Sequence, residues 1–190
     1  MRQLAFSLSV LCLLATPATG ETSFQFAAAG AQSPADPDVN GFRLVLFYGK
    51  NQSVSGFDLG IASLSETTNA SGFSMNWGMS KVSGQSSGLA SSFVNLHSGE
   101  DTSVNAAFIN SVKTLKSGVN IGFINVTDGY SNVDISGMGI SKKSNVQLGF
   151  VNITGEIEGL QIGFLNIAEN GIFPVLPVFN FPKKRTTPSH

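Results

Sequence analysis

The sequence predicts an all-β repeat protein, and three observations support that fold class. A motif of about eight residues recurs in about nine units over residues 42–168, and successive units begin 13–16 residues apart. Within each unit apolar residues alternate with polar or small ones, which is the period-two pattern of a β-strand. Apolar residues do not recur at the 3.6-residue period of an amphipathic helix. We therefore expect short strands joined by polar turns.

The columns of the repeat indicate which side chains share a face of each strand. Positions one, three and five are large and apolar, as in Val119, Ile121 and Phe123. Position two is usually polar, position four is usually small, and most charges fall between units. This alternation predicts strands that bury their apolar face. The units begin at Phe42, Phe57, Phe73, Leu89, Val104, Val119, Val133, Val146 and Leu160.

A β-solenoid, in which each unit is a coil stacked on the next, is the architecture that the repeat favours. The same motif recurs on every unit, as expected for coils that all run in one direction. Position seven is repeatedly Asn, and stacked coils would align these side chains into a ladder of amide hydrogen bonds. Position five is repeatedly Phe, which in a solenoid would lie in the core. These structural columns are Phe93, Phe108, Phe123, Phe150 and Phe164, and Asn95, Asn110, Asn125, Asn152 and Asn166.

An up-and-down antiparallel β-barrel of outer-membrane type is the alternative fold. Its strands need 9 to 11 residues with an apolar face, which the units nearly reach, and the Phe column would then face lipid. One Trp and two Tyr are too few for aromatic girdles at both membrane interfaces. Another β-sandwich is the third alternative.

The order of elements follows from composition along the chain. Residues 1–20 are expected to be a signal peptide, because Arg2 precedes an apolar run and small residues precede the cleavage point. Residues 21–181 form a single β-repeat domain with an irregular first strand over 22–31, a linker over 35–40, and a C-terminal cap over 171–181. Pro174 and Pro177 cannot donate to a ladder, so the cap would stop further pairing. Residues 182–190 are expected to be a disordered tail.

Composition excludes some classes of protein. The formal net charge is -1 and 12% of residues are charged, so no basic surface is available for nucleic acid. The single cysteine, Cys12, lies in the predicted signal peptide, so the domain would fold without a disulfide.

Few residues suit catalysis, and we expect no enzymatic activity and no cofactor. His97 is predicted in a solvated turn and His190 in the tail, which leaves neither a Ser-His-Asp triad nor a zinc site. The carboxylate pairs Glu100–Asp101 and Glu156/Glu158 are interpreted as solvated turns. The Gly residues at position four are expected on the inner side of a tight coil rather than at a phosphate. They are Gly60, Gly122, Gly149 and Gly163.

Asp36, Asp38 and Asn40 are the candidate metal ligands. Oxygen ligands at alternate positions followed by Gly41 match the first half of a calcium loop. The twelfth position is Phe47, where such a loop requires a bidentate Glu. A polar turn is the simpler interpretation.

Three segments carry a resemblance to a known family: VNGFRLVLFYGKN at 39–51, GLQIGFLNI at 159–167 and NGIFPVLPVFNF at 170–181. They resemble the surface repeat-containing proteins, a family of small exported bacterial proteins. The resemblance covers most of the chain after residue 20, although the units from Phe42 to Leu89 depart from the pattern. It implies a location at the outer membrane or cell surface, and it implies no biochemical activity.

Together these observations predict a non-enzymatic exported repeat protein that acts as a structural or interaction module at the bacterial cell envelope. The expected location is the outer membrane or cell surface, and otherwise the periplasm. The alternative is a small outer-membrane barrel that serves as a pore or scaffold. The envelope partner is left open, with membrane association as one alternative and nucleic acid not expected.

Overall fold

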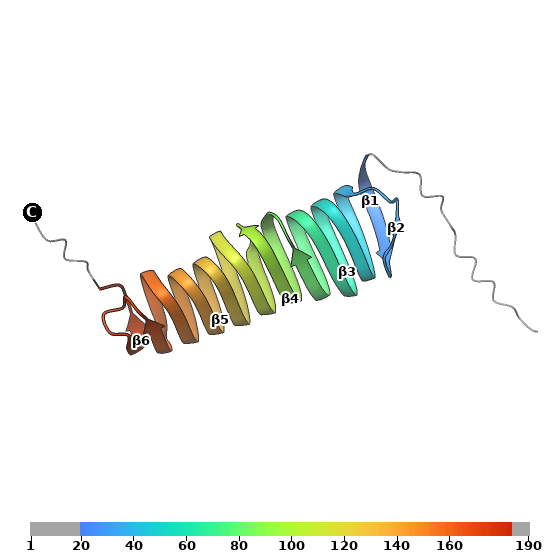
Figure 1. Ribbon diagram of the computed structural model, residues 1–190. Coiled ribbons are helices and arrows are strands. Elements are labelled where there is room, and N and C mark those ends of the chain that lie inside the picture. The colour runs from blue at the N-terminus through green and yellow to red at the C-terminus, as the bar shows by residue number, and fades with distance from the viewer. Residues whose placement is uncertain (1–19, 184–190) are drawn as a thin grey trace, which may run out of the picture.

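The protein is a rod of stacked β-coils. The computed structural model describes residues 20–183, so most of the predicted signal peptide and of the predicted tail lies outside the described residues. Figure 1 shows the N-terminal strands at one end of the rod and the C-terminal strand at the other. The strands are β1 (Glu21–Ala28), β2 (Ala31–Ser33), β3 (Asp38–Val82), β4 (Ser86–Asp101), β5 (Val104–Ala168) and β6 (Val175–Asn180).

The parallel pairing of the coils confirms the predicted solenoid. The sheet order is β2-β1-β3-β4-β5-β6, and the pairs β1–β3, β3–β4 and β4–β5 are all parallel. Partners lie one coil apart in sequence, as in Leu89 with Val104. An up-and-down barrel requires antiparallel neighbours, so that alternative is wrong for residues 20–183. No helix long and apolar enough to cross a membrane occurs in this part of the chain.

Each coil bends at recurring positions, which gives it three sides. Pairing between β4 and β5 is continuous over 89–92, omits Phe93, and resumes at Val94. It is interrupted again after His97, and a short break separates β4 from β5. In this coil we call residues 89–92 side 1, 94–97 side 2 and 98–103 side 3, and we use the same names for equivalent residues of the other coils. Phe93 therefore lies at the corner between side 1 and side 2.

A column of glycines allows the coils to approach closely where side 3 leads into the next side 1. Gly56, Gly72 and Gly88 have φ values of 117°, 102° and 104°, which L side chains rarely adopt. A Cβ atom on Gly72 would overlap the carbonyl oxygen of Gly56, and one on Gly88 would overlap that of Gly72. These glycines therefore hold successive coils in register.

The core of the rod is mainly polar, with fewer buried apolar side chains such as Val112, so the prediction that the apolar face of the repeat is buried is wrong. Arg43 is the largest of the fully buried side chains, and Leu115 and Ile157 are the largest apolar ones. The position-two side chains and the predicted Asn column point inward. All of these have no exposed surface: Asn105, Asn120, Asp134, Gln147, Gln161, Asn95, Asn110, Asn125, Asn152 and Asn166.

The amide ladder predicted from the Asn column is present in two segments. Asn95 Nδ2 donates to Asn110 Oδ1 at 3.0 Å, and Asn110 Nδ2 donates to Asn125 Oδ1 at 2.9 Å. Asn152 Nδ2 donates to Asn166 Oδ1 at 2.8 Å. The segments are separate because the unit between them has Gly139 at position seven.

A second ladder runs along position two. Asn105 Nδ2 donates to Asn120 Oδ1 at 2.9 Å, and Gln161 Nε2 donates to Gln147 Oε1 at 2.7 Å. Stacked strands place equivalent side chains about 4.8 Å apart, so one amide reaches the next at each step. Hydrogen bonding of this kind offsets the desolvation of the buried amides. It explains why a narrow coil can bury polar columns and leave the large apolar side chains outside.

Antiparallel segments cover part of the outermost coil at each end of the stack. β2 pairs with β1 at the N-terminal end, and β6 pairs with the last coil of β5, with Gln161 opposite Asn180. The predicted cap over 171–181 contains β6. The linker expected over 35–40 is shorter than predicted, because β3 begins at Asp38 and pairs there with β1.

Candidate functional site

An aromatic edge runs along the outside of the rod at the corner between side 1 and side 2. We call it the Phe edge, and it consists of the position-five aromatic residues. Trp77 occupies this position in its unit and is 69% exposed, although the column predicted from the sequence contained only Phe residues. The predicted Phe column is thus outside the core. The exposed fractions are 63% for Phe93, 47% for Phe108, 59% for Phe123, 63% for Phe150 and 70% for Phe164.

The rings of the Phe edge stack in two runs along the rod, because the unit between the runs has Gly137 at position five. Phe108 lies between Phe93 and Phe123, with ring centroids 5.4 and 5.2 Å away and interplanar angles of 12° and 6°. Phe150 and Phe164 stack in the same way, with centroids 5.0 Å apart. Because each ring covers the face of its neighbour, inner rings such as Phe108 present their edges outward. A sugar or base therefore cannot stack on the face of an inner ring.

Both sides next to the Phe edge are apolar on their outer surface. On side 1, Ile121, Ile135 and Ile162 are 42%, 40% and 45% exposed. On side 2 the outward residues are Val, Ile and Leu in most coils, and Val126 is 36% exposed. Soluble monomers rarely expose a continuous apolar surface this long, and such surfaces usually mark an interaction site.

Most exposed ion pairs lie on side 3, away from the Phe edge, while Lys81–Glu66 lies on side 2 of the N-terminal coils. Lys116 pairs with Glu100 at 2.7 Å, Lys142 with Asp128 at 2.7 Å, and Lys143 with Glu158 at 2.8 Å. The predictions that Glu100 and the pair Glu156/Glu158 are solvated hold, since these side chains are about half exposed. Each such pair contributes little to stability. The coil is therefore amphipathic in cross-section, with an apolar wedge opposite a charged side.

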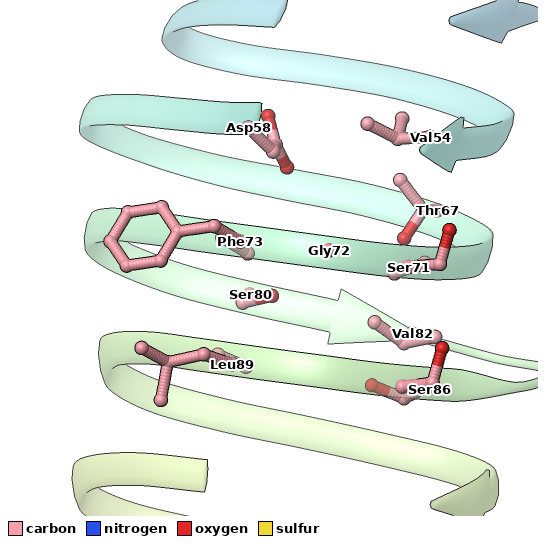
Figure 2. A pocket seen from close by; sticks show the side chains of 14 residues that line it. Val54, Asp58, Thr67, Ser71, Gly72, Phe73, Ser80, Val82, Ser86 and Leu89 are labelled. Atoms are coloured by element: carbon pink, nitrogen blue, oxygen red, sulfur yellow. The ribbon is translucent and has the colours of Figure 1, made fainter. Parts of the chain in front are cut away.

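A small cavity lies within the stack and is drawn in Figure 2. Its lining includes Asp58, Thr67, Ser80 and Ser86, and the figure shows Phe73 and Leu89 on the opposite side of the coils from Val54 and Val82. The volume is about 20 Å³, far below the roughly 300 Å³ of the smallest usual ligand pockets. This cavity is a packing gap of the polar core and not a ligand site.

A buried ion pair lies in the N-terminal coils. Arg43 Nε and Nη2 donate to Asp58 Oδ1 and Oδ2 at 2.8 and 2.6 Å, and Arg43 also contacts Asn51 and Ser65. Arg43 has no exposed surface and Asp58 is 7% exposed. Sequence analysis missed this pair, although both residues occupy position two of successive units and so stack directly.

His97 and Asp101 form a second buried pair, so the prediction that both are solvated is wrong. His97 Nδ1 contacts Asp101 Oδ2, and the two residues are 2% and 0% exposed. Burial raises the pKa of Asp101, but hydrogen bonds from His97 and Ser103 outweigh it and leave the pKa below its usual value. Ser103 Oγ donates to Asp101 and not to the imidazole. The cluster is therefore not arranged as a nucleophile and its base, in which the hydroxyl must contact the imidazole.

Asp134 is a buried carboxyl group without a cationic partner. Asn125 Nδ2 donates to its Oδ1 at 2.6 Å, while its Oδ2 has no hydrogen-bond partner. Burial raises the pKa of Asp134 to about 6, despite the hydrogen bond from Asn125. Compared with the unfolded chain, the folded protein favours the neutral form of Asp134, so ionisation of this carboxyl group at neutral pH weakens the fold.

We expect Asp134→Asn to stabilise the protein increasingly as pH rises from 4 to 8. The folded pKa of about 6 lies above the ordinary value of 3.8, so the stability associated with Asp134 is fully present below pH 4 and is lost as pH rises through 6. A difference of about two pKa units corresponds to about 3 kcal/mol. Urea unfolding of both proteins at pH 4 and pH 8 measures the effect. A stability difference that does not change with pH would contradict it.

The candidate calcium ligand Asp36 lies between β2 and β3. Asp38 and Asn40 lie in the extended start of β3, and no group of three or more His, Cys, Asp or Glu side chains in residues 20–183 is placed to hold a metal ion. The carbonyl oxygen of Asp36 accepts hydrogen bonds from Gln25 and Asn51. Side chains of the core thus fix this turn.

No known family model, curated protein or solved structure matches this chain. The resemblance to surface repeat-containing proteins therefore stays a prediction.

Proposed function

We propose that this chain is a non-enzymatic, exported repeat protein that acts as a structural or interaction module at the bacterial cell envelope. The observation that carries this proposal is the exposed Phe edge with its two apolar flanks. A rigid apolar surface that continues over many coils is suited to binding an extended partner. The apolar run near the N-terminus and the resemblance to exported surface proteins favour the envelope as the location.

The ionisable groups of the rod also favour a binding role over catalysis. Arg43, Asp58, His97, Asp101 and Asp134 lie in the polar core, out of reach of a substrate. Most of the exposed charged side chains form ion pairs, and most of these pairs lie on side 3. The alternative function as a pore requires a barrel, whereas the coils of this chain pair in parallel.

The double substitution Phe123→Ser and Phe164→Ser tests this proposal in cells. Both side chains are more than half exposed, so the variant should fold, while the apolar contact with the partner is reduced. The full-length chain, expressed in a bacterium, should fractionate with the envelope, and the double variant should shift to the soluble fraction.

Lys142→Gln is the matched control, because it removes a 72% exposed charge on side 3 without touching the Phe edge. This control should fractionate like the original protein. Equal envelope retention of the double variant and the original would contradict the proposal, as would a fully soluble original protein.

A further inference from the structure

We propose that the partner of the Phe edge is the hydrocarbon region of a lipid bilayer, into which the rod inserts its apolar wedge along its length. The inference rests on the proposed envelope function and identifies the partner class for the same surface. From Leu89 onward, side 1 and side 2 would lie among acyl chains and side 3 would face water. The Lys81–Glu66 pair lies on side 2 of the preceding coils, and this part of side 2 would lie at the level of the headgroups.

The shape of the apolar surface favours lipid over a protein surface. Side 1 and side 2 are both apolar outside and meet at the corner occupied by Phe93 and its equivalents. A flat face of a second copy can cover one flank of a wedge but not both at once. A fluid hydrocarbon phase surrounds both flanks together, so it covers all of the exposed apolar surface.

The backbone of the rod meets the main requirement of a hydrocarbon environment. Polar backbone groups must be paired within the protein there, because the bilayer core offers no hydrogen-bond partners. The parallel pairing of β3, β4 and β5 joins each coil to the next over both apolar sides. Only the ends of the stack leave strand edges, and β2 and β6 cover part of these.

The distribution of charge on the rod determines how deeply the rod inserts into the bilayer and which lipids it prefers. The exposed ion pairs Lys116–Glu100, Lys142–Asp128 and Lys143–Glu158 all lie on side 3. A surface element with one apolar face and one charged face lies at the membrane interface. Over residues 98–159 the solvated charges of side 3 balance, with Lys113, Lys116, Lys142 and Lys143 against Glu100, Asp128, Glu156 and Glu158. Side 3 therefore offers no excess positive charge to anionic headgroups. Binding should therefore occur with zwitterionic lipid and should depend little on salt.

Trp77 provides an internal probe, since it is the single tryptophan of the chain and belongs to the Phe edge. When the purified full-length protein is mixed with phosphatidylcholine vesicles, its tryptophan emission should shift to the blue. Phosphatidylcholine brominated on the acyl chains should quench the emission. Addition of phosphatidylglycerol should not strengthen binding.

Two variants distinguish insertion of the Phe edge into the bilayer from attachment through another part of the chain. Loss of the two exposed rings in Phe123→Ser and Phe164→Ser should weaken the vesicle partition by about a hundredfold, at about tenfold for each ring. Lys142→Gln should bind as the original protein does. Equal binding by the double variant would overturn the inference, because the apolar leader region would then account for the attachment.

The same experiments distinguish failure of this inference from failure of the proposed function. Retention in the cell envelope without any emission shift on phosphatidylcholine vesicles would overturn the lipid assignment and leave the proposed function in place, with a protein partner. A dimer that forms as the protein concentration rises, without binding to vesicles, would also overturn the lipid assignment. The partner of the Phe edge would then be a second copy of the chain. Absence of both envelope retention and vesicle binding would overturn the function as well.

Discussion

Arg43→Met should lower the free energy of unfolding by about 3 to 5 kcal/mol. The substitution leaves Asp58 buried without its cation, and an uncompensated buried charge costs an amount of this order. Asn51 and Ser65 also lose a donor. Urea unfolding monitored by circular dichroism measures the change.

Two further variants test whether the loss of stability in Arg43→Met comes from the unpaired buried charge of Asp58. The double variant Arg43→Met and Asp58→Leu should recover most of the lost stability, because a buried ion pair replaced by apolar residues is often close to neutral. Lys142→Gln removes an exposed ion pair and should cost less than about 1 kcal/mol. A loss of similar size for Arg43→Met and Lys142→Gln would mean that Arg43 is not buried in the core.

Asn125→Ala should lower the free energy of unfolding by about 2 to 5 kcal/mol. Asn125 accepts a hydrogen bond from Asn110 and donates to Asp134 and to the carbonyl oxygen of Asn120. Each buried polar group left without a partner costs about 1 to 3 kcal/mol. Asn110 keeps its second acceptor, the carbonyl oxygen of Ile121, which limits the loss.

Thermal and urea unfolding of Asn125→Ala measure this effect, with Asn40→Ala as the matched control. Asn40 is exposed on the outside of β3, so its replacement should change stability by less than about 0.5 kcal/mol. If the two variants unfold at the same urea concentration, the amide ladder does not stabilise the rod.

The fold was predictable from the sequence because the repeat is local and its columns stack. A spacing near 15 residues with the same motif on every unit indicates coils that run in one direction, and the Asn column indicates an amide ladder. Gly122 at position four was also correctly placed inside, since a Cβ atom there would lie 2.6 Å from Asn125 Oδ1.

The orientation of the coil was not predictable from periodicity alone. Alternation shows that Asn120 and Phe123 lie on opposite faces of a strand. The usual expectation is that the apolar face is buried, but here the face with Asn120 is buried. The interior of a coil is narrow and stacks identical side chains, so amides that bond to their own copies fit it better than Phe does. Position four offered a signal, because its small residues lie on the same face as the Asn of position two.

The burial of individual charged residues was also difficult to predict from the sequence. His97 and Asp101 are polar residues near the end of a unit, and nothing in their spacing distinguishes them from a solvated turn. Their burial follows from the third side of the coil closing over them, which is a property of the stack. Arg43 and Asp58 were recoverable, because two opposite charges at position two of successive units must meet.

The measurement that tests the account most directly is the free energy of unfolding of Phe123→Ser and Asn125→Ala, determined side by side. The two residues are close in sequence but lie on opposite sides of the coil wall, Phe123 59% exposed and Asn125 fully buried. The polar-core solenoid predicts that Asn125→Ala loses about 2 to 5 kcal/mol, while Phe123→Ser changes by less than about 1 kcal/mol. The reverse order, with Phe123→Ser unfolding the protein and Asn125→Ala close to the original, would contradict it.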